Sequence, residues 1–172
     1  MRTLNRLKHG FTLIEILVVI VIIGILSAIV TTNFVGARER AQDSQKKSNL
    51  RELKTALRLY YVDYHKYPEY DMGIYFKGCG INGNTRCPTS GTTSFSAGTK
   101  TYLEKIPSSS NFSFNYFTCS GGDDFRLKIT LSNASDPDIS ESQRNCPCAT
   151  CGDKTCGQLN YGAKEIIMCG SQ

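Results

Sequence analysis

Residues 11–30 read FTLIEILVVIVIIGILSAIV, a run of about twenty residues that carries a single charge, Glu15. A helix needs about 20 apolar residues to cross the hydrocarbon core of a bilayer, whereas the apolar part of a secretory signal has only about 7–15. Three basic residues precede the run, namely Arg2, Arg6 and Lys8. The positive-inside rule then places the N-terminus in the cytoplasm and the C-terminus outside. We therefore expect residues 11–34 to span the cytoplasmic membrane as a helix.

Helical signals continue beyond this run but change in character. Apolar and aromatic residues recur at three- and four-residue steps, which is typical of an amphipathic helix. The residues on this stripe are Ala41, Leu50, Leu53, Leu57, Tyr60 and Tyr64. No proline occurs between Phe11 and Tyr67, and Pro68 disfavours helix at the residue before it. We expect residues 35–67 to be the amphipathic half of one helix of about 55 residues, about 80 Å long.

Residues 68–172 have the composition of a small domain with short strands. Apolar and polar residues alternate over residues 112–116, and they do so again over residues 125–131 after the turn-forming residues 120–123. Alternation of this kind predicts an antiparallel hairpin whose apolar face covers the stripe of the helix. Residues 166–168 predict a further short strand.

All eight cysteines lie in the C-terminal half of the chain. An even number of cysteines in a loop-rich extracytoplasmic segment predicts a disulfide framework, although eight cysteines allow about 105 pairings. The candidates are Cys79, Cys87, Cys119, Cys146, Cys148, Cys151, Cys156 and Cys169. By composition we expect residues 79–99 and 133–162 to be loops that these bridges hold in place. Reduced structural cysteines are one alternative. Zinc is another, although the cysteines at 146–156 do not form two C-x-x-C pairs.

The sequence carries weak signals for metal binding or covalent modification and almost none for catalysis. Acidic loop residues are candidates for structural calcium, without a complete calcium-loop motif, and otherwise we expect no metal or cofactor. These candidates are Asp123, Asp124, Asp136, Asp138 and Glu141. Asn111 and Asn133 begin glycosylation triplets, a pattern that is frequent by chance. The only histidines are His9 and His65, and no nucleophile and base can be paired, so we do not expect an enzyme.

The charge balance does not indicate a nucleic-acid-binding protein. The formal net charge is +5, and it falls to +2 without the three basic residues before the apolar run, since 17 basic residues then face 15 acidic ones. Nucleic-acid proteins normally show a clustered basic face. We therefore expect no direct contact with nucleic acid.

Glu15 is the residue that points to a function. A carboxylate inside a transmembrane helix costs about 2.5–3.5 kcal/mol on insertion scales, so it is usually functional and paired. Partial hydration near the cytoplasmic interface is the alternative. Residues 8–15, KHGFTLIE, resemble the prepilin cleavage motif of type IV pilins and pseudopilins. In that family a short basic leader ends in Gly, the mature chain begins with a methylated Phe, and a Glu follows four residues later.

The resemblance implies a processing and assembly pathway. Residues 1–10 would be a leader, removed by a prepilin peptidase between Gly10 and Phe11, and the new amine of Phe11 would be methylated. Glu15 of an incoming subunit would pair with the amine of a neighbour, which relieves two charges that are each costly in lipid. The implied partners are identical or related pilin subunits, the peptidase, the pilus or secretion machinery, and membrane lipid before assembly.

The resemblance also implies a fold and a function. The fold is α+β: a pilin fold with a long N-terminal helix, its first half transmembrane, packed on a small antiparallel sheet with disulfide-stapled loops. Residues 68–172 would be the globular, cysteine-rich head. We expect a structural subunit of a type IV pilus-like filament, first anchored by one membrane span and then extracellular or periplasmic. One alternative is a pseudopilin of a type II secretion or competence system. The other is an anchored extracytoplasmic binding domain that never polymerises.

Two further segments extend the likeness, and one position departs from it. Residues 53–68, LKTALRLYYVDYHKYP, resemble the helix end found in many pilins and in the major pseudopilin of type II secretion. Residues 102–107, YLEKIP, resemble a segment that this family carries after its variable loop. Many pilins have a proline beyond the position of Gly24, where this chain has Thr32. If family helices unwind there during assembly, the weakness must come from other residues in this chain, because Gly costs about 1 kcal/mol relative to Ala in a helix. Those residues are Gly24, Thr31, Thr32 and Gly36.

Overall fold

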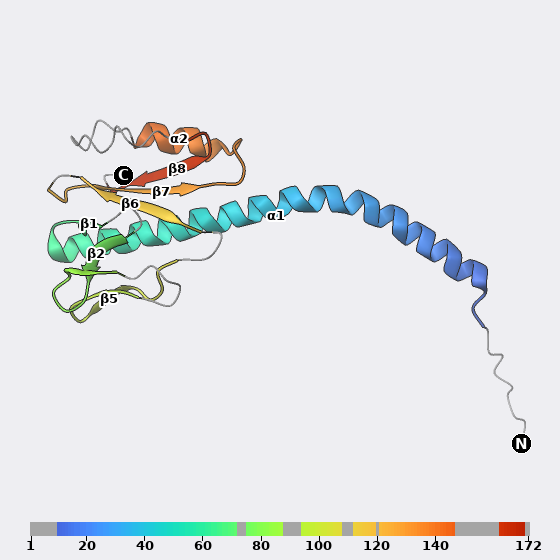
Figure 1. The fold of residues 1–172 in the computed structure, drawn as a ribbon, viewed down its shortest axis with the longest axis horizontal. Coiled ribbons are helices and arrows are strands. Elements are labelled where there is room, and N and C mark those ends of the chain that lie inside the picture. Colours follow the sequence, from blue (N-terminus) through green and yellow to red (C-terminus); the bar gives the residue numbers. More distant parts are fainter. Residues whose placement is uncertain are drawn as a thin grey trace, which may run out of the picture. The chain divides into compact units, whose positions relative to one another are not determined.

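The computed structural model describes residues 10–71, 75–87, 94–107, 112–119, 121–146 and 162–170, except for the side chains of residues 29–33. The chain divides into two compact units, which we call the N-terminal unit (residues 1–39) and the head unit (residues 40–172). The elements in chain order are α1 (Leu13–Tyr64), β1 (Tyr70–Asp71), β2 (Tyr75–Cys79), β3 (Thr85–Arg86), β4 (Phe95–Ala97), β5 (Lys100–Leu103), β6 (Phe114–Thr118), β7 (Phe125–Thr130), α2 (Pro137–Asn145) and β8 (Glu165–Cys169) (Figure 1). The protein is therefore α+β, with a long N-terminal helix and antiparallel sheets.

The first helix is continuous over 52 residues, as the sequence predicts, but it ends three residues earlier than expected. Tyr64 is its last residue, and His65 has a φ of 54°. A residue in this left-handed region commonly terminates a helix, and His65 still donates its backbone N–H to the carbonyl of Tyr61 at 2.8 Å. The reversal at His65, and not the proline at position 68, therefore sets the end of α1.

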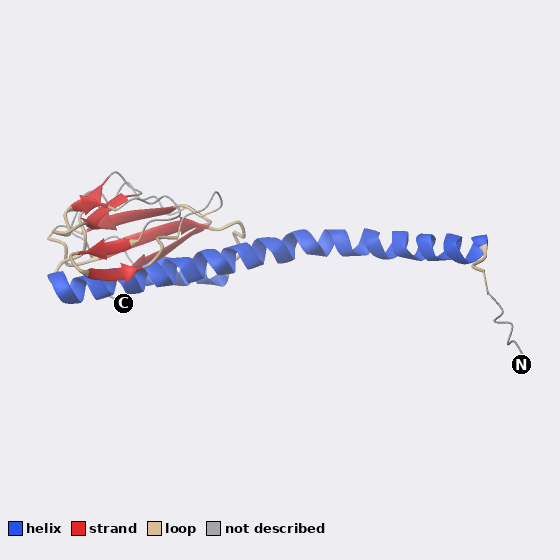
Figure 2. Ribbon diagram, turned by 90° about the horizontal axis from the view of Figure 1, so that it is seen from below, coloured by secondary structure: helices blue, strands red, loops and turns tan. Residues whose placement is uncertain are grey.

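The C-terminal part of α1 provides the helical wall of the core in the head unit. Its stripe residues Leu50, Leu53 and Leu57 are fully buried, and Tyr60 is nearly so, as the periodicity predicts. Figure 2 shows the strands lying over this part of the helix. The prediction was wrong for Ala41, which is exposed. The buried position near that end of the stripe belongs to a charged residue, Asp43, because the sheet supplies hydrogen-bond donors there.

The main sheet has the order β6–β7–β8, with both pairs antiparallel. The predicted hairpin is therefore confirmed, and so is the short strand at residues 166–168. Phe114 pairs with Ile129 and Tyr116 with Leu127, so these apolar side chains share one face. All four are buried in the same cluster as the stripe of α1.

The second face of this sheet is more buried than alternation predicts. Arg126 is only 1% exposed, although the sequence places it among the solvent-facing residues of the hairpin. Its register partners are Phe117 on β6 and Cys169 on β8. Cys169 and Ile167 lie on this face and form a second buried cluster with Cys146 from the end of α2. The expectation of a half-buried strand was wrong at Arg126 because protein covers part of both faces of the sheet.

The two segments predicted to be loop contain regular structure. Within residues 79–99, β3 pairs with β2 and β4 pairs with β5, both antiparallel, and a bridge joins Gly80 to Ala97. Within residues 133–162, the described part forms the helix α2. The sequence carried the helix signals, because Asp136 caps the helix by accepting from the N–H of Asp138 and a proline occupies the first turn. The prediction of a loop rested on the polar composition of the segment and did not use these helix signals.

Candidate functional site

The start of α1 is organised by a reciprocal pair of hydrogen bonds between Thr12 and Glu15. The backbone N–H and the hydroxyl of Thr12 each donate to Oε2 of Glu15 at 2.8 Å. The N–H of Glu15 points back to the hydroxyl oxygen of Thr12 at 3.4 Å. This is a capping box, in which two side chains satisfy backbone donors that a helix start leaves open. The carboxylate also lies where the helix dipole favours negative charge.

The carboxylate of Glu15 is only partly used by this box. Both bonds from Thr12 end on Oε2, and no residue in the described part of the chain donates a hydrogen bond to Oε1. Gly10 and Phe11 precede the box and are exposed, the side chain of Phe11 by 84%. The site therefore presents an exposed Gly–Phe junction and, at the same end of the helix, a carboxylate oxygen that no described residue contacts through a hydrogen bond.

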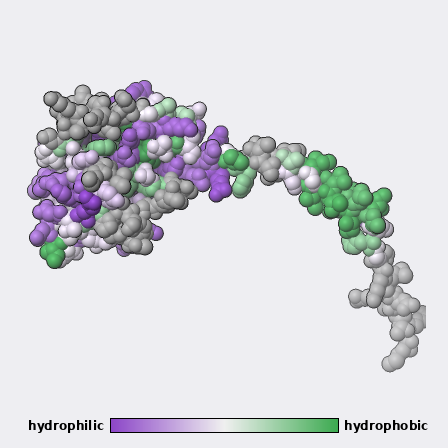
Figure 3. Space-filling view, in the orientation of Figure 1, coloured by the Kyte–Doolittle hydropathy of each residue, from purple (hydrophilic) through white to green (hydrophobic). Residues whose placement is uncertain are grey.

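Between Leu13 and Leu26 the helix of the N-terminal unit exposes apolar side chains, with Glu15 as its one charged residue. Its large apolar side chains between Leu13 and Leu26 are each about half exposed or more. Figure 3 shows this surface as an almost unbroken hydrophobic patch. The hydroxyl of Ser27 is satisfied inside the helix, because it donates to the carbonyl of Ile23 at 2.7 Å. A patch of this size on a protein normally marks an interaction surface.

Two expectations for this helix concern its membrane span and its points of weakness. Among the residues that the structure describes, no helix is long and apolar enough to count as a candidate membrane span. The backbone of α1 stays helical through Gly24 and Gly36, where added Cβ atoms would meet nothing within 4 Å. Weakness of the helix at these glycines therefore stays a prediction about assembly.

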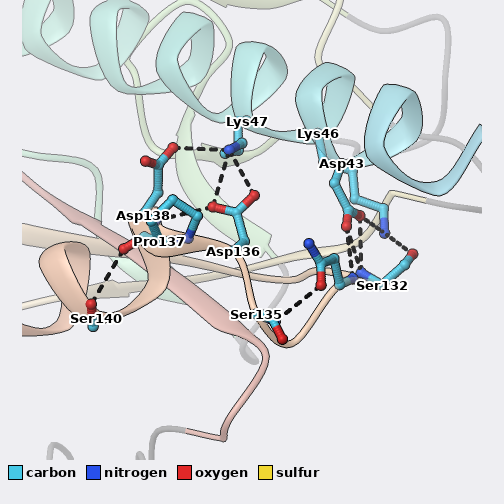
Figure 4. Close-up of polar contacts among 10 residues, drawn as sticks. Asp43, Lys46, Lys47, Ser132, Ser135, Asp136, Pro137, Asp138 and Ser140 are labelled. Carbon is cyan, nitrogen blue, oxygen red and sulfur yellow. Dashed lines mark hydrogen bonds and ion pairs between the residues drawn. The ribbon is translucent and has the colours of Figure 1, made fainter. Parts of the chain in front are cut away.

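Within the head unit, the buried carboxylate of Asp43 joins α1 to the segment that follows β7 (Figure 4). The N–H of Ser132 donates to both oxygens of Asp43, at 2.9 and 3.0 Å, and the N–H of Asn133 donates at 2.8 Å. The ammonium of Lys46 adds an ion pair at 3.1 Å and also donates to the carbonyl of Thr130. Burial by itself raises the pKa of Asp43, but these hydrogen bonds and the charge of Lys46 outweigh it and lower the pKa. Asp43 is therefore held as a carboxylate.

A second ionic contact ties α2 to α1. The ammonium of Lys47 lies 2.9 Å from a carboxylate oxygen of Asp136 and 2.9 Å from one of Asp138 (Figure 4). Burial lowers the pKa of Lys47, but the hydrogen bonds and charges of the two aspartates outweigh it and raise the pKa. Asp136 thus has two roles, because it also caps α2. The contact places α2 alongside the first helix.

The calcium candidates do not converge on one site. Asp136 and Asp138 direct oxygens at Lys47, Asp124 accepts from the N–H of Phe125 at 2.8 Å, and Asp123 is exposed. Within the described ranges, no three His, Cys, Asp or Glu residues are grouped so that they could hold a metal ion.

Two disulfides join pairs of described cysteines in the head unit. Cys79 bonds Cys87 across the β2–β3 turn, and Cys146 bonds Cys169, joining the end of α2 to the end of β8. Cys119 is also disulfide-bonded. The sulfur of Cys146 is therefore not the thiolate that the zinc alternative requires. The remaining candidates, Cys148, Cys151 and Cys156, lie outside the described residues.

Two functional positions were not singled out from the sequence, and both had a local signal. Thr12 completes the pattern T-x-x-E directly before an apolar run, which is the signature of a capping box. Asp43 lies seven residues before Leu50 and therefore falls on the apolar side of the helix, where a charge needs partners. Of the two asparagines that begin glycosylation triplets, Asn133 donates its backbone N–H to Asp43. The other, Asn111, lies outside the described residues.

Comparison with known proteins shows what the N-terminal part of this chain is similar to. Residues 5–31 match the prokaryotic N-terminal methylation motif. The chain is similar to the type II secretion system core protein G of Escherichia coli (strain K12), with 43% identity over 67 residues, which is 39% of this chain and 46% of the relative. It is similar to core protein G of Aeromonas hydrophila, with 41% identity over 70 residues, covering 41% and 49% of the two chains. The type IV major pilin protein PilA of Myxococcus xanthus is 39% identical over 72 residues, covering 42% and 33%.

These matches cover only part of each chain. The chain spans about half the length of the curated relatives it matches. No solved structure matches it. The methylation motif and the named relatives together support the type IV pilin and type II secretion pseudopilin family.

Proposed function

We propose that this protein is a structural subunit of a type IV pilus-like filament and not an enzyme. A prepilin peptidase cuts the chain after Gly10, Phe11 is then N-methylated, and subunits polymerise through the N-terminal helix. The observation that carries the proposal is the Gly–Phe junction followed at once by the Thr12–Glu15 capping box and an apolar helix.

The geometry of Glu15 supports pairing between subunits. Oε2 is held by Thr12, and Oε1 is free to accept a hydrogen bond from the amine of Phe11 in a neighbouring copy. In an apolar surrounding both the carboxylate and the amine are costly alone, so their pairing relieves two penalties and selects one axial register. The capping box keeps the carboxylate at the end of the helix, where such an amine would arrive.

The apolar surface of the N-terminal unit needs a cover both before and after assembly. We propose that residues 11–34 first lie across the cytoplasmic membrane, with the N-terminus inside and the head unit outside. They then leave lipid for the core of the filament, where the helices of neighbouring subunits replace it. The exposure of apolar residues along the helix supports both environments.

A second candidate within the same family is a pseudopilus subunit of a type II secretion system. The likeness to core protein G favours it. The disulfide-stapled head unit favours a surface pilus, because bridges protect a loop-rich domain outside the cell. Deletion of the gene separates the two. Loss of surface filaments with normal protein secretion supports the pilus, and retained secreted proteins support the pseudopilus.

The decisive test of the proposal is the N-terminal and intact mass of the protein recovered from its own cells. We expect a chain that begins at Phe11 and is heavier by one methyl group. In Glu15→Leu we expect the same processing and membrane insertion but no filament. An uncut N-terminus together with normal behaviour of Glu15→Leu would support instead an anchored binding domain that never polymerises.

A further inference from the structure

The main sheet ends at β8, and the outer edge of this strand faces no further strand among the described elements. In an antiparallel pair, residues whose N–H and C=O groups point at the partner strand alternate with residues whose groups point away. The N–H of Gly170 donates to β7 at 3.2 Å, so the register turns the backbone groups of every second preceding residue away from β7. These outward residues are Glu165, Ile167 and Cys169. Outward backbone groups on an edge are a template for another strand.

Side chains of α2 occupy this edge. The hydroxyl oxygen of Ser142 accepts from the N–H of Ile167 at 3.3 Å, while the same hydroxyl donates to the carbonyl of Ile139 at 2.8 Å. The amide of Gln143 donates to the carbonyl of Glu165 at 3.0 Å. Figure 1 shows α2 running next to β8. Two of the groups that a further strand would pair with are therefore already paired with a helix.

The helix follows the strand in step. Four residues of a helix advance about 6 Å, and two residues of a strand advance about 6.6 Å. The step from Ser142 to Cys146 therefore matches the step from Ile167 to Cys169. Ser142 bonds to Ile167. Cys146 forms its disulfide with Cys169, so the contacts of α2 extend over the whole outer edge of β8.

Two fastenings hold α2 in this place. At its start, Lys47 of α1 pairs with Asp136 and Asp138 at 2.9 Å each. At its end, the disulfide of Cys146 joins it to the last residue of β8. Between these ends the helix is polar, and Ile139 is its one buried residue. Little apolar burial therefore holds α2 on β8, and its position depends on the ion pairs and the disulfide.

We propose that α2, fastened by Lys47 and the Cys146–Cys169 bridge, is a cover that keeps β8 from pairing with the β8 edge of a second copy. The partner is a second copy because the edge is self-complementary. Two such edges in antiparallel alignment place Ile167 opposite Ile167 and Glu165 opposite Cys169, so that each outward N–H meets a C=O. A pairing of this kind is isologous and stops at a dimer. The inference concerns the head unit and does not rest on the proposed filament.

The test compares two variants of the full-length protein in detergent that both lack the bridge and differ at one backbone N–H. They are Cys146→Ser/Cys169→Ser, the serine variant, and Cys146→Ser/Cys169→Pro, the proline variant. Proline fits an edge strand where its missing N–H points outward, so it blocks a second strand and spares the ladder to β7. In sedimentation equilibrium we expect the serine variant to dimerise on the order of tenfold more tightly than the wild type, and the proline variant to return near the wild-type value. Exchange of the amides at residues 165–168 should slow with rising concentration in the serine variant alone.

A third variant covers the case in which tyrosine fluorescence shows that the head unit of the serine variant does not fold. Lys47→Glu retains the bridge and repels the start of α2 through Asp136 and Asp138. It should therefore also dimerise more tightly than the wild type. Lys66→Glu is the matched control, because it makes the same charge change at an exposed residue beyond the end of α1, and it should behave as the wild type.

Two outcomes would overturn the inference. One is a serine variant that folds and associates no more than the wild type, or Lys47→Glu that associates no more where the serine variant is unfolded. The other is equal dimerisation of the serine and proline variants, which would place the contact away from the edge of β8. Neither outcome depends on cleavage after Gly10 or on filaments, so the proposed function stands or fails by its own test.

Discussion

Replacing Asp43 with alanine tests how the segment after β7 is held on the C-terminal part of α1. Asp43 is 1% exposed and accepts hydrogen bonds from the backbone N–H groups of Ser132 and Asn133 and from the ammonium of Lys46. Alanine leaves two backbone donors without their acceptor, and each such loss costs about 1–3 kcal/mol. Both donors are only partly shielded, so we expect a loss of about 3 kcal/mol in the free energy of unfolding. At this size of domain that is a fall of about 10 °C in Tm.

The chain offers a clean probe for this measurement. It has no tryptophan, and all nine tyrosines follow residue 59. Tyrosine fluorescence of the full-length protein in detergent therefore reports unfolding of the head unit. Asp43→Asn should lose about half as much stability as Asp43→Ala, because its one amide oxygen still accepts from one of the two backbone donors. Glu52→Gln is the control, since Glu52 is exposed without an ion pair among the described residues, and it should shift stability by less than about 0.5 kcal/mol.

The dependence on pH gives the same prediction an independent check. The pKa of Asp43 in the folded protein is lower than its ordinary value. Its stabilisation is therefore fully present above the unfolded pKa, about 3.9, and is lost as the pH falls toward the folded value. The difference between wild type and Asp43→Asn should shrink below about pH 4. A loss below about 1 kcal/mol for Asp43→Ala at neutral pH would show that solvent satisfies these donors and would refute the reasoning.

Three further changes test other contacts. Thr12→Val removes the hydroxyl of the capping box, which donates to Glu15 and accepts from its N–H, and should cost about 1 kcal/mol at the helix start. The loss should appear as faster amide exchange at residues 13–16 with unchanged processing, and unchanged exchange would mean that the hydroxyl does not cap the helix. Replacing Cys146 and Cys169 together with serine opens a bridge 23 residues apart in sequence and should cost about 3 kcal/mol in urea unfolding, against no loss if other contacts hold the end of α2. Lys47→Met should cost on the order of 1 kcal/mol, and because the pKa of Lys47 is raised in the folded state, this difference should persist up to about pH 10 and vanish as the pH rises further. A difference that instead disappears near neutral pH would contradict the ion pair.

The sequence predicted the elements whose signal is local. The long helix, the hairpin of β6 and β7 and the short strand β8 follow from periodicity that a few turns or pleats are enough to display. The predictions were wrong for the end of α1 and for the segment that contains α2. The helix ends at a left-handed His65 before Pro68 can act. The composition of residues 133–162 predicts a loop, whereas Asp136 and the following proline start the helix α2 there.

The amino-acid sequence by itself determined the apolar helix, the Gly10–Phe11 junction and the place of Glu15, because spacing along a single helix decides all three. Only the tertiary structure decided which residues join the sheet and α2 to the C-terminal part of α1 and how the described cysteines pair. Asp43 meets Ser132 across 89 residues, and Lys47 meets Asp138 across 91. Contacts at such separations depend on how the sheet and α2 pack against α1. No local pattern encodes that packing. Asp43, whose charge suggests a surface position, is therefore buried in the fold and accepts hydrogen bonds from the sheet side of the head unit.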